Sequence, residues 1–235
     1  MLEELKIKVC DANIELKQQH FVICNWGNVS GIDRDLGVIA IKPSGAPYNE
    51  LGPDKIVVLN LDGKKIEGDL NPSSDTQTHL ELYRNFKQIG GVCHTHSYYA
   101  TMWAQACKEI PALGTTGADY FYGSVPVTGP LIDDEIKNDY ELNTGKVIVR
   151  RFARIDPLSM PAVLVASHGP FTWGKTPMAS VESALVLEEV ANKVAVANKE
   201  IPVSIETDKN NITLKLKDSL SLEAGQSIQI QLDIK

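Results

Sequence analysis

Hydrophobic positions recur along the chain with two different periods, and each period predicts one kind of element. In residues 2–19 the apolar side chains return every three or four positions, which places them on one face of a helix. Helices are also expected over four later segments: 71–86, 97–107, 133–143 and about 177–199. The third of these should end near Gly145. The last should have Thr176 as its cap and Pro177 as its first residue.

Short apolar runs between these helices predict strands. They cover residues 37–45, 55–66, 90–94 and 162–171, and the last of these segments begins as a strand and runs into a loop. The second run should form a hairpin that turns at Asp62–Gly63. Because strands alternate with helices, the pattern predicts an α/β sandwich built around a central sheet.

The last part of the chain has a different pattern. Residues 198–235 alternate apolar and polar positions, as in ITLKLK and SIQIQLDI, with turn signals at Asn210–Asn211 and Gly225. This period of two predicts a β-hairpin or β-meander. The expected division is therefore an α/β domain over 1–197 followed by a β-rich tail over 198–235.

Length, charge and cysteine usage narrow the class of protein. A chain of 235 residues fits one domain with a sizeable core. The 23 basic and 30 acidic residues give a net charge of −7, which disfavours a nucleic-acid partner or an anionic membrane surface. The beginning of the chain has no apolar signal-peptide run, and its four cysteines have no CxxC spacing, so we expect reduced thiols in a cytoplasmic protein.

Histidines offer the first candidate chemistry. His94 and His96 lie two positions apart at the end of an apolar run, so both rings project from the same face of an extended chain. His168 closes the strand pattern at 162–171 in the same way, and parallel packing of the two strands would bring all three rings to one sheet edge. Three neutral imidazoles suit a divalent transition metal, zinc first. His20 and His79 fit structural or surface roles better.

A carboxylate and two hydroxyls precede the helix predicted at 71–86. Asp75 could complete the metal site as a further ligand, although Ser-Ser-Asp before a helix is also typical of a helix cap. Ser73 and Ser74 would stand at the N-terminal end of that helix. There the free backbone amides and the helix dipole favour a phosphate group.

The segment IKPSG provides a second anion signal. Lys42 supplies a positive charge, while Ser44 and Gly45 supply a hydroxyl and a close backbone approach. Each segment taken alone fits an ordinary turn. Together they predict a phosphorylated small molecule bound near a metal ion.

Residues 169–176, GPFTWGKT, match the pattern of a phosphate-binding P-loop. The interior of the segment argues against that function. Pro170 has no amide donor, and Phe171 and Trp173 are bulky where the backbone would wrap a phosphate. No apolar strand ending in a suitable aspartate accompanies the segment either, so we do not expect an NTPase.

Seven longer motifs occur in the order found in L-ribulose-5-phosphate 4-epimerases, members of the class II aldolase/adducin-like superfamily. The motifs are WGNVSG, IKPSG, PSSDTQTHLELY, HTHSYYATMWAQA, GTTGADYFYGSVPVTG, YELNTGKVI and SHGPFTWGK. The resemblance spans about residues 1–195. It implies a class II aldolase-like α/β/α sandwich with a mostly antiparallel or mixed sheet. It also implies a zinc-dependent isomerase acting on a phosphorylated pentulose, and a homotetramer with active sites between subunits.

The resemblance also assigns roles to individual residues. His94, His96 and His168 resemble the metal ligands, with Asp75 as the fourth ligand or a closely associated carboxylate. The residues that resemble substrate and phosphate contacts are Gly27, Asn28, Ser44, Gly45, Ser73 and Ser74, assisted by Lys42. Asp119 resembles the acid/base that a neighbouring subunit contributes.

The implied reaction breaks the C3–C4 bond in a retro-aldol step, turns the aldehyde over and re-forms the bond with inverted C4. Two acid/base groups are needed, one on each face.

The chain departs from the family pattern in two places. Gly117 stands where the epimerase motif usually carries His, and the tail lacks the helical, basic segment with a catalytic Tyr, since the last tyrosine is Tyr140. Thr115 and Glu141 fall in matching motifs without a defined role.

Two alternatives stay open on the sequence. A fuculose-phosphate-type class II aldolase would release an aldehyde from a sugar phosphate, but that branch carries Glu where this chain has Asp75. A non-catalytic adducin-like scaffold would not need the three histidines that this chain retains.

Overall fold

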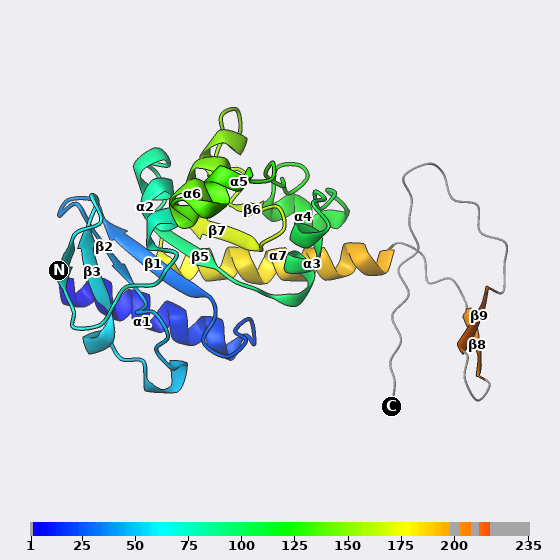
Figure 1. Cartoon of the computed structure of the whole chain (residues 1–235), viewed down its shortest axis with the longest axis horizontal. Coiled ribbons are helices and arrows are strands. Elements are labelled where there is room, and N and C mark those ends of the chain that lie inside the picture. Colours follow the sequence, from blue (N-terminus) through cyan, green and yellow to red (C-terminus); the bar gives the residue numbers. More distant parts are fainter. Residues whose placement is uncertain (1, 198–202, 208–211, 217–235) are drawn as a thin grey trace. The chain divides into compact units, whose positions relative to one another are not determined.

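The computed structural model describes residues 2–197, 203–207 and 212–216 (Figure 1). The chain divides into two compact units, Met1–Ala195 and Val196–Lys235, and each is described by itself. The helices of the first unit are α1 Leu2–Gln18, η1 Tyr48–Glu50, η2 Pro53–Lys55, α2 Thr76–Asn85, α3 Tyr98–Gln105, α4 Gly114–Tyr120, α5 Asp133–Lys137, α6 Tyr140–Arg151 and α7, which covers Pro177–Ala197. Its strands are β1 Asn28–Asp33, β2 Val38–Ile41, β3 Val57–Asn60, β4 Lys65–Glu67, β5 Gly91–His94, β6 Ala162–Leu164 and β7 Pro170–Gly174.

These seven strands form one sheet in the order β4-β3-β2-β1-β5-β7-β6, and each neighbouring pair is antiparallel. The hairpin expected at 55–66 is present as β3 and β4. The expectation of a mostly antiparallel sheet is confirmed. The strands that lead to His94 and His168 run parallel to each other, as expected, but they are not neighbours, because β7 lies between β5 and β6 and runs antiparallel to both. The two strands still point the same way, so their ends reach the same edge of the sheet.

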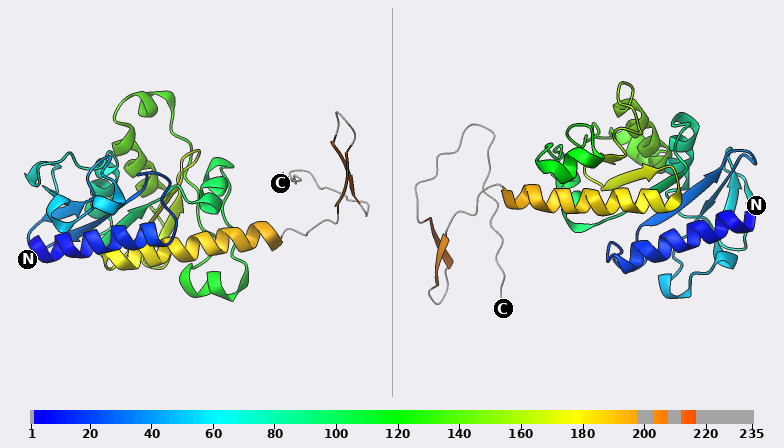
Figure 2. Two further views of the ribbon diagram at one scale, coloured as in Figure 1. Left: turned by 90° about the horizontal axis from the view of Figure 1, so that it is seen from below. Right: turned by 180° about the vertical axis from the view of Figure 1, so that it is seen from behind.

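Helices cover both faces of the sheet. Helices α1 and α7 lie on one face, while α2 and α6 lie on the other (Figure 1 and Figure 2). The side chains of β1 alternate accordingly: Val29 packs in the cluster formed with α1 and α7, whereas Ser30 bonds to His79 and Tyr83 of α2. Helix, sheet and helix therefore form successive layers.

Strand β1 was missed by the sequence pattern because NVSGID has no clear period of two. Its first four residues are all buried, since helices cover both sides. Gly31 shows how close that cover is. A methyl group added there would lie 2.7 Å from a Pro177 side-chain carbon and 2.9 Å from one of Val9. A glycine at this point lets α1 and α7 approach the sheet.

Two expected elements are divided in the structure. The helix predicted at 133–143 is two helices, α5 and α6, and Gly145 lies inside α6 rather than near a helix end. Between them Asp139 adopts a left-handed backbone with φ 52°. The segment 162–171, predicted as a strand that runs into a loop, is instead the hairpin β6–β7, whose turn contains Ser167 at φ 62° and His168. Periodicity does not detect such short backbone reversals.

Residues 170–174 of the P-loop-like segment form buried strand β7, paired with both β5 and β6. The backbone of these residues pairs with neighbouring strands and is not free to wrap a phosphate, which agrees with the argument against a P-loop. In the second unit, strands β8 (Val203–Thr207) and β9 (Ile212–Leu216) pair antiparallel, in agreement with the predicted hairpin. The expected turns at 210–211 and 225, and the run SIQIQLDI, lie outside the described residues.

The four cysteines are free thiols. Within the described ranges, no helix combines the length and apolar character needed to cross a membrane.

Candidate metal centre and active site

Three histidines from two parts of the chain converge at one edge of the sheet. His94 is the last residue of β5, His96 follows two residues later, and His168 lies in the β6–β7 turn. One ligand nitrogen from each ring lies within 4.8 Å of the others. The Nε2 atoms of His94 and His96 are 3.0 Å apart, and the ring centroids of His94 and His168 are separated by 4.8 Å. The predicted convergence of the three rings is therefore observed.

The contacts of His94 define which nitrogen is free to bind a metal ion. Its Nδ1 lies 2.9 Å from the carbonyl oxygen of Pro170, which can only accept a hydrogen bond. The ring proton therefore lies on Nδ1, and Nε2 presents a lone pair toward His96. The ring also stacks on Phe171 at 4.1 Å between centroids, so its orientation is fixed from two sides.

The protonation of the other two rings fits a metal ligand. Burial lowers the pKa of His96 to about 4 and that of His168 to about 3, and the neighbouring His94 lowers both in the same direction. Both imidazoles are neutral at pH 7 and keep a lone pair. Two nitrogens held at about 2.0–2.1 Å by a tetrahedral zinc ion are about 3.3 Å apart, near the separation seen between His94 and His96. The residues present fit zinc.

Asp75 lies beside the three histidines but outside the set of mutually close ligand atoms. Its Oδ2 accepts a hydrogen bond of 2.6 Å from Nδ2 of Asn28, and among the described residues it makes no side-chain cap on α2. Asp75 is thus the N-cap residue of α2 by position, as the helix-cap interpretation expects, but its side chain is directed to Asn28 and does not cap the helix. Burial alone would raise the pKa of this carboxyl, but His94, His79 and the Asn28 hydrogen bond together lower it below its ordinary value. Asp75 is a carboxylate at neutral pH.

These groups open into one cavity of about 690 Å³. Its walls are Cys24, Asn25, Trp26, Gly27, Asn28, Lys42, Pro43, Ser44, Gly45, Ser73, Ser74, Asp75, His94, His96, Tyr140, Glu141 and His168. Every residue expected to bind metal or substrate is among them. Within the described residues, Oδ1 of Asn28 is buried and has no hydrogen-bond partner, so a polar ligand atom can satisfy it.

The two segments expected to bind an anion run alongside each other in this cavity. The amide of Ser44 donates to the carbonyl of Asn71, and the amide of Ser73 donates to the carbonyl of Lys42. Gly45 has a left-handed φ of 66°, which a glycine adopts at little cost. Backbone pairing therefore holds the hydroxyls of both segments in a single wall.

Lys42 is only 2% exposed, which is unusual for a lysine. Its Nζ lies 3.3 Å from the Asn25 carbonyl, 3.4 Å from its neighbour's carbonyl and 4.6 Å from the centre of the Tyr48 ring. Burial lowers the pKa of Lys42 to about 8, opposed in part by the negative charge of Asp75. A buried ammonium with weak, long partners is suited to receive a phosphate.

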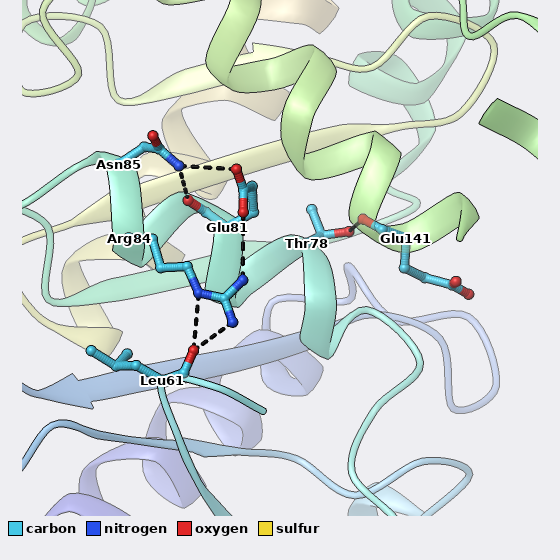
Figure 3. Close-up of polar contacts among 6 residues, drawn as sticks. All are labelled: Leu61, Thr78, Glu81, Arg84, Asn85 and Glu141. Atoms are coloured by element: carbon cyan, nitrogen blue, oxygen red, sulfur yellow. Dashed lines mark hydrogen bonds and ion pairs between the residues drawn. The ribbon is translucent and has the colours of Figure 1, made fainter. Parts of the chain in front are cut away.

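Helices α2 and α6 are joined near their N-terminal ends by a hydrogen bond (Figure 3), and residues at both of these ends line the cavity. The hydroxyl of Thr78 donates to the carbonyl of Glu141 at 2.6 Å. A methyl group on Gly145 would lie 2.6 Å from Cβ of Glu81, so only a glycine permits this spacing. Arg84 of α2 also donates to the carbonyl of Leu61, which fixes the loop after β3 (Figure 3). The site thus has a rigid wall on this side.

A buried carboxylate holds the segment after His96. Glu188 of α7 accepts hydrogen bonds from the Ser97 hydroxyl at 2.7 Å and from the amides of Tyr99 and Ala100 at 2.7 and 2.9 Å. These are the free donors at the start of α3, so Glu188 caps that helix from another part of the chain. The chain that carries His96 is anchored on both sides.

Asp119 is the predicted site residue that does not join the others. It is exposed on α4, outside the cavity of its own chain.

Two residues of the site, Tyr140 and Trp26, were not predicted from the sequence. Trp26 is 56% exposed at the cavity wall, with its ring 6.0 Å from that of His96. Tyr140 is hydrogen-bonded to His168. Both residues belong to motifs that resemble the epimerases, but spacing alone indicated no function for either.

Residues 7–194 match the family described as Class II Aldolase and Adducin N-terminal domain. The chain belongs to this family. It is 50% identical over 196 residues to the L-ribulose-5-phosphate 4-epimerase UlaF of Salmonella paratyphi C (strain RKS4594) and equally to that of Salmonella typhi. Each alignment covers 83% of this chain and 86% of the relative.

Solved structures agree on the fold. An L-fuculose 1-phosphate aldolase is 25% identical with a TM-score of 0.70, over 83% of this chain and 86% of that one. The l-fuculose-1-phosphate aldolase from Thermus thermophilus is 22% identical with a TM-score of 0.66, over 84% of this chain and 96% of its own.

Proposed function

We propose that this chain is a zinc-dependent L-ribulose-5-phosphate 4-epimerase that interconverts L-ribulose 5-phosphate and D-xylulose 5-phosphate. One observation carries the proposal: three converging imidazoles and a cradle for a phosphate open into the same cavity. The identity of 50% to named 4-epimerases supports the choice of substrate. A cytoplasmic location stays a prediction.

When bound, zinc would supply Lewis-acid stabilisation of the negative charge that develops on the substrate as the C3–C4 bond breaks. His94, His96 and His168 would hold it, with Asp75 as a fourth ligand or an adjacent carboxylate that Asn28 orients. Burial keeps the rings of His96 and His168 neutral, and the bond to Pro170 orients the ring of His94 before substrate arrives, so little reorganisation is needed during the reaction.

The bond cleavage moves one proton and one electron pair. A base removes the proton of the C4 hydroxyl, C4 becomes an aldehyde carbon, and the C3–C4 electron pair passes to the C1–C3 fragment as an enediolate. The aldehyde fragment retains the phosphate and is therefore glycolaldehyde phosphate. After this fragment turns, C3 attacks its other face, and an acid returns a proton to the new C4 oxygen.

The phosphate cradle has a specific task in this scheme. Because the phosphate stays on the aldehyde, Lys42, Ser44 and the Ser73–Ser74 segment would retain the fragment that has to turn. Contacts to the phosphate leave rotation about the bonds between C4 and phosphorus free. The cradle thus favours re-formation of the bond over escape of the aldehyde.

Asp119 is proposed as one of the two acid/base groups, acting in the cavity of a neighbouring subunit of a homotetramer. Its exposed position on α4, away from the cavity of its own chain, supports this assignment. Large apolar side chains are also exposed on α3, on α4 and on the segment between them, as a subunit contact requires. They include Tyr98, Met102, Leu113 and Tyr120.

The test is a single incubation of the purified, zinc-loaded protein with L-ribulose 5-phosphate, in which D-xylulose 5-phosphate and free aldehyde are both measured. Formation of the epimer in excess of aldehyde supports the epimerase. Aldehyde without epimer would identify a class II aldolase instead, and a chain that produces neither from this substrate would overturn the proposal.

A further inference from the structure

One of the three histidines, His168, is in contact with a tyrosine side chain from helix α6. The hydroxyl of Tyr140 lies 3.1 Å from Nδ1 of His168, and the two ring centroids are 5.9 Å apart. His94 has its Nδ1 bound to a backbone carbonyl that the β5–β7 pairing fixes. His168 lies in a turn, and its Nδ1 bonds instead to a side chain from a different helix.

The backbone around Tyr140 is fixed on both sides of the residue. Asp139, immediately before it, has a left-handed φ of 52°, a conformation that non-glycine residues seldom adopt. This reversal separates α5 from α6 and makes Tyr140 the first residue of α6. The Thr144 hydroxyl donates to the carbonyl of Tyr140 at 2.9 Å, and Thr78 donates to the carbonyl of Glu141 at 2.6 Å. An unusual backbone is therefore held where it directs one phenol ring toward His168.

We propose that Tyr140 is a positioning residue for the metal centre, whose hydroxyl oxygen accepts the Nδ1–H of His168 and so directs the Nε2 lone pair of that ring toward the metal ion. The inference rests on the proposed metal-dependent function. A histidine that binds a metal through one nitrogen carries its proton on the other, and a partner for that proton fixes both tautomer and ring orientation. The Tyr140 hydroxyl keeps its own proton and remains a donor in the cavity that it lines.

The experiment compares wild type with Tyr140→Phe, which removes the hydroxyl and keeps the ring. The dissociation constant for zinc is measured by competition with a chromophoric chelator, and the visible absorption spectrum is recorded after loading with cobalt. We expect about a 10- to 100-fold weaker zinc affinity and a changed cobalt spectrum in the variant. Tyr122→Phe is the matched control, because Tyr122 is 87% exposed and lies outside the cavity. It should behave as wild type.

A double-mutant cycle isolates the pair. In a His168→Ala background, Tyr140→Phe should change zinc affinity no further, because its partner ring is absent. The thermal midpoint of each protein without metal separates a loss of affinity from a loss of folding. Equal zinc affinity and equal cobalt spectra for wild type and Tyr140→Phe would overturn the inference. A wild-type chain that binds no zinc would instead overturn the metal-dependent function on which it rests.

Discussion

The Nε2 atoms of His94 and His96 face each other at 3.0 Å at the end of β5. Pro170 and Phe171 of the neighbouring strand β7 fix the ring of His94. Two imidazole nitrogens this close together can bind the same metal ion, and the third ring, from the β6–β7 turn, completes the set of ligands. His96→Ala should therefore remove most of the bound zinc, measured by elemental analysis after dialysis. The control is His20→Asn, at an exposed residue with φ 61° that asparagine tolerates. Equal zinc in wild type and His96→Ala would show that the site is wrongly assigned.

Lys42→Met tests the phosphate cradle. A charge-assisted contact contributes about 1.5–3 kcal/mol, so KM for L-ribulose 5-phosphate should rise by roughly one to two orders of magnitude. Because the phosphate stays on the aldehyde fragment, the ratio of free glycolaldehyde phosphate to epimer should rise as well. Lys8→Met, at a lysine that pairs with Glu4 on the exposed surface of α1, serves as the control. An unchanged KM in Lys42→Met would exclude the cradle.

The same lysine predicts the alkaline limit of activity. Burial lowers the pKa of Lys42 to about 8, so the charged form, present below this pH, is lost as the pH rises through it. The phosphate of the substrate is already doubly ionised there, since its second pKa is about 6. We expect kcat/KM to fall above that limit by about one to two orders of magnitude, toward the level of Lys42→Met. Lys42→Met should lack this limb, and a wild-type profile that stays flat up to about pH 10 would refute the assignment.

Asp119 can be tested by mixing subunits. Asp119→Asn and His96→Ala chains should each be inactive as homotetramers. If the acid/base and the metal ligands of one site come from neighbouring chains, a mixture of equal parts, unfolded and refolded together, has about one quarter of its sites intact. The mixture should therefore show about one quarter of the wild-type activity. Failure to regain activity in mixed tetramers, with both parents folded, would place Asp119 outside the shared site.

The tail yields a prediction about rate. Residues 198–235 contain no tyrosine, whereas the resemblance implies a catalytic Tyr in that region. A positioned acid/base contributes about 10²–10⁴-fold, so kcat for epimerisation should fall short of that of UlaF-type relatives by this factor. The comparison is made under identical conditions with full zinc loading. A kcat near the enzyme median of about 10 s⁻¹ would mean that another group, such as Asp218, Glu223 or Asp233, replaces the missing tyrosine.

Local sequence patterns predicted much of this molecule. The spacing in residues 2–19 is helix α1, the hairpin around Asp62–Gly63 is β3 and β4, and His94 ends a strand as expected. These features depend on neighbours in the sequence, which a hydrophobic pattern records directly.

The parts that the pattern missed depend on distant neighbours or on single backbone angles. Strand β1 is polar and glycine-containing because both of its faces are covered closely, which no window of its own sequence reveals. The break at Asp139 and the turn before His168 each rest on one residue with positive φ. The backbone break at Asp139 places Tyr140 at the cavity. The sequence pattern predicted one continuous helix over 133–143, so it gave no indication that Tyr140 lines the site.

Pairing of distant strands also determines when the site can form. His94 and Pro170 are separated by 76 residues in sequence, and Asn28 and Asp75 by 47, so each contact closes a long loop. Contacts of such separation slow folding, because the chain entropy lost in closing the loop precedes the energy gained. The metal centre should consequently be among the last features to mature. The time at which the refolding chain gains tight metal affinity would then report when the native sheet is complete.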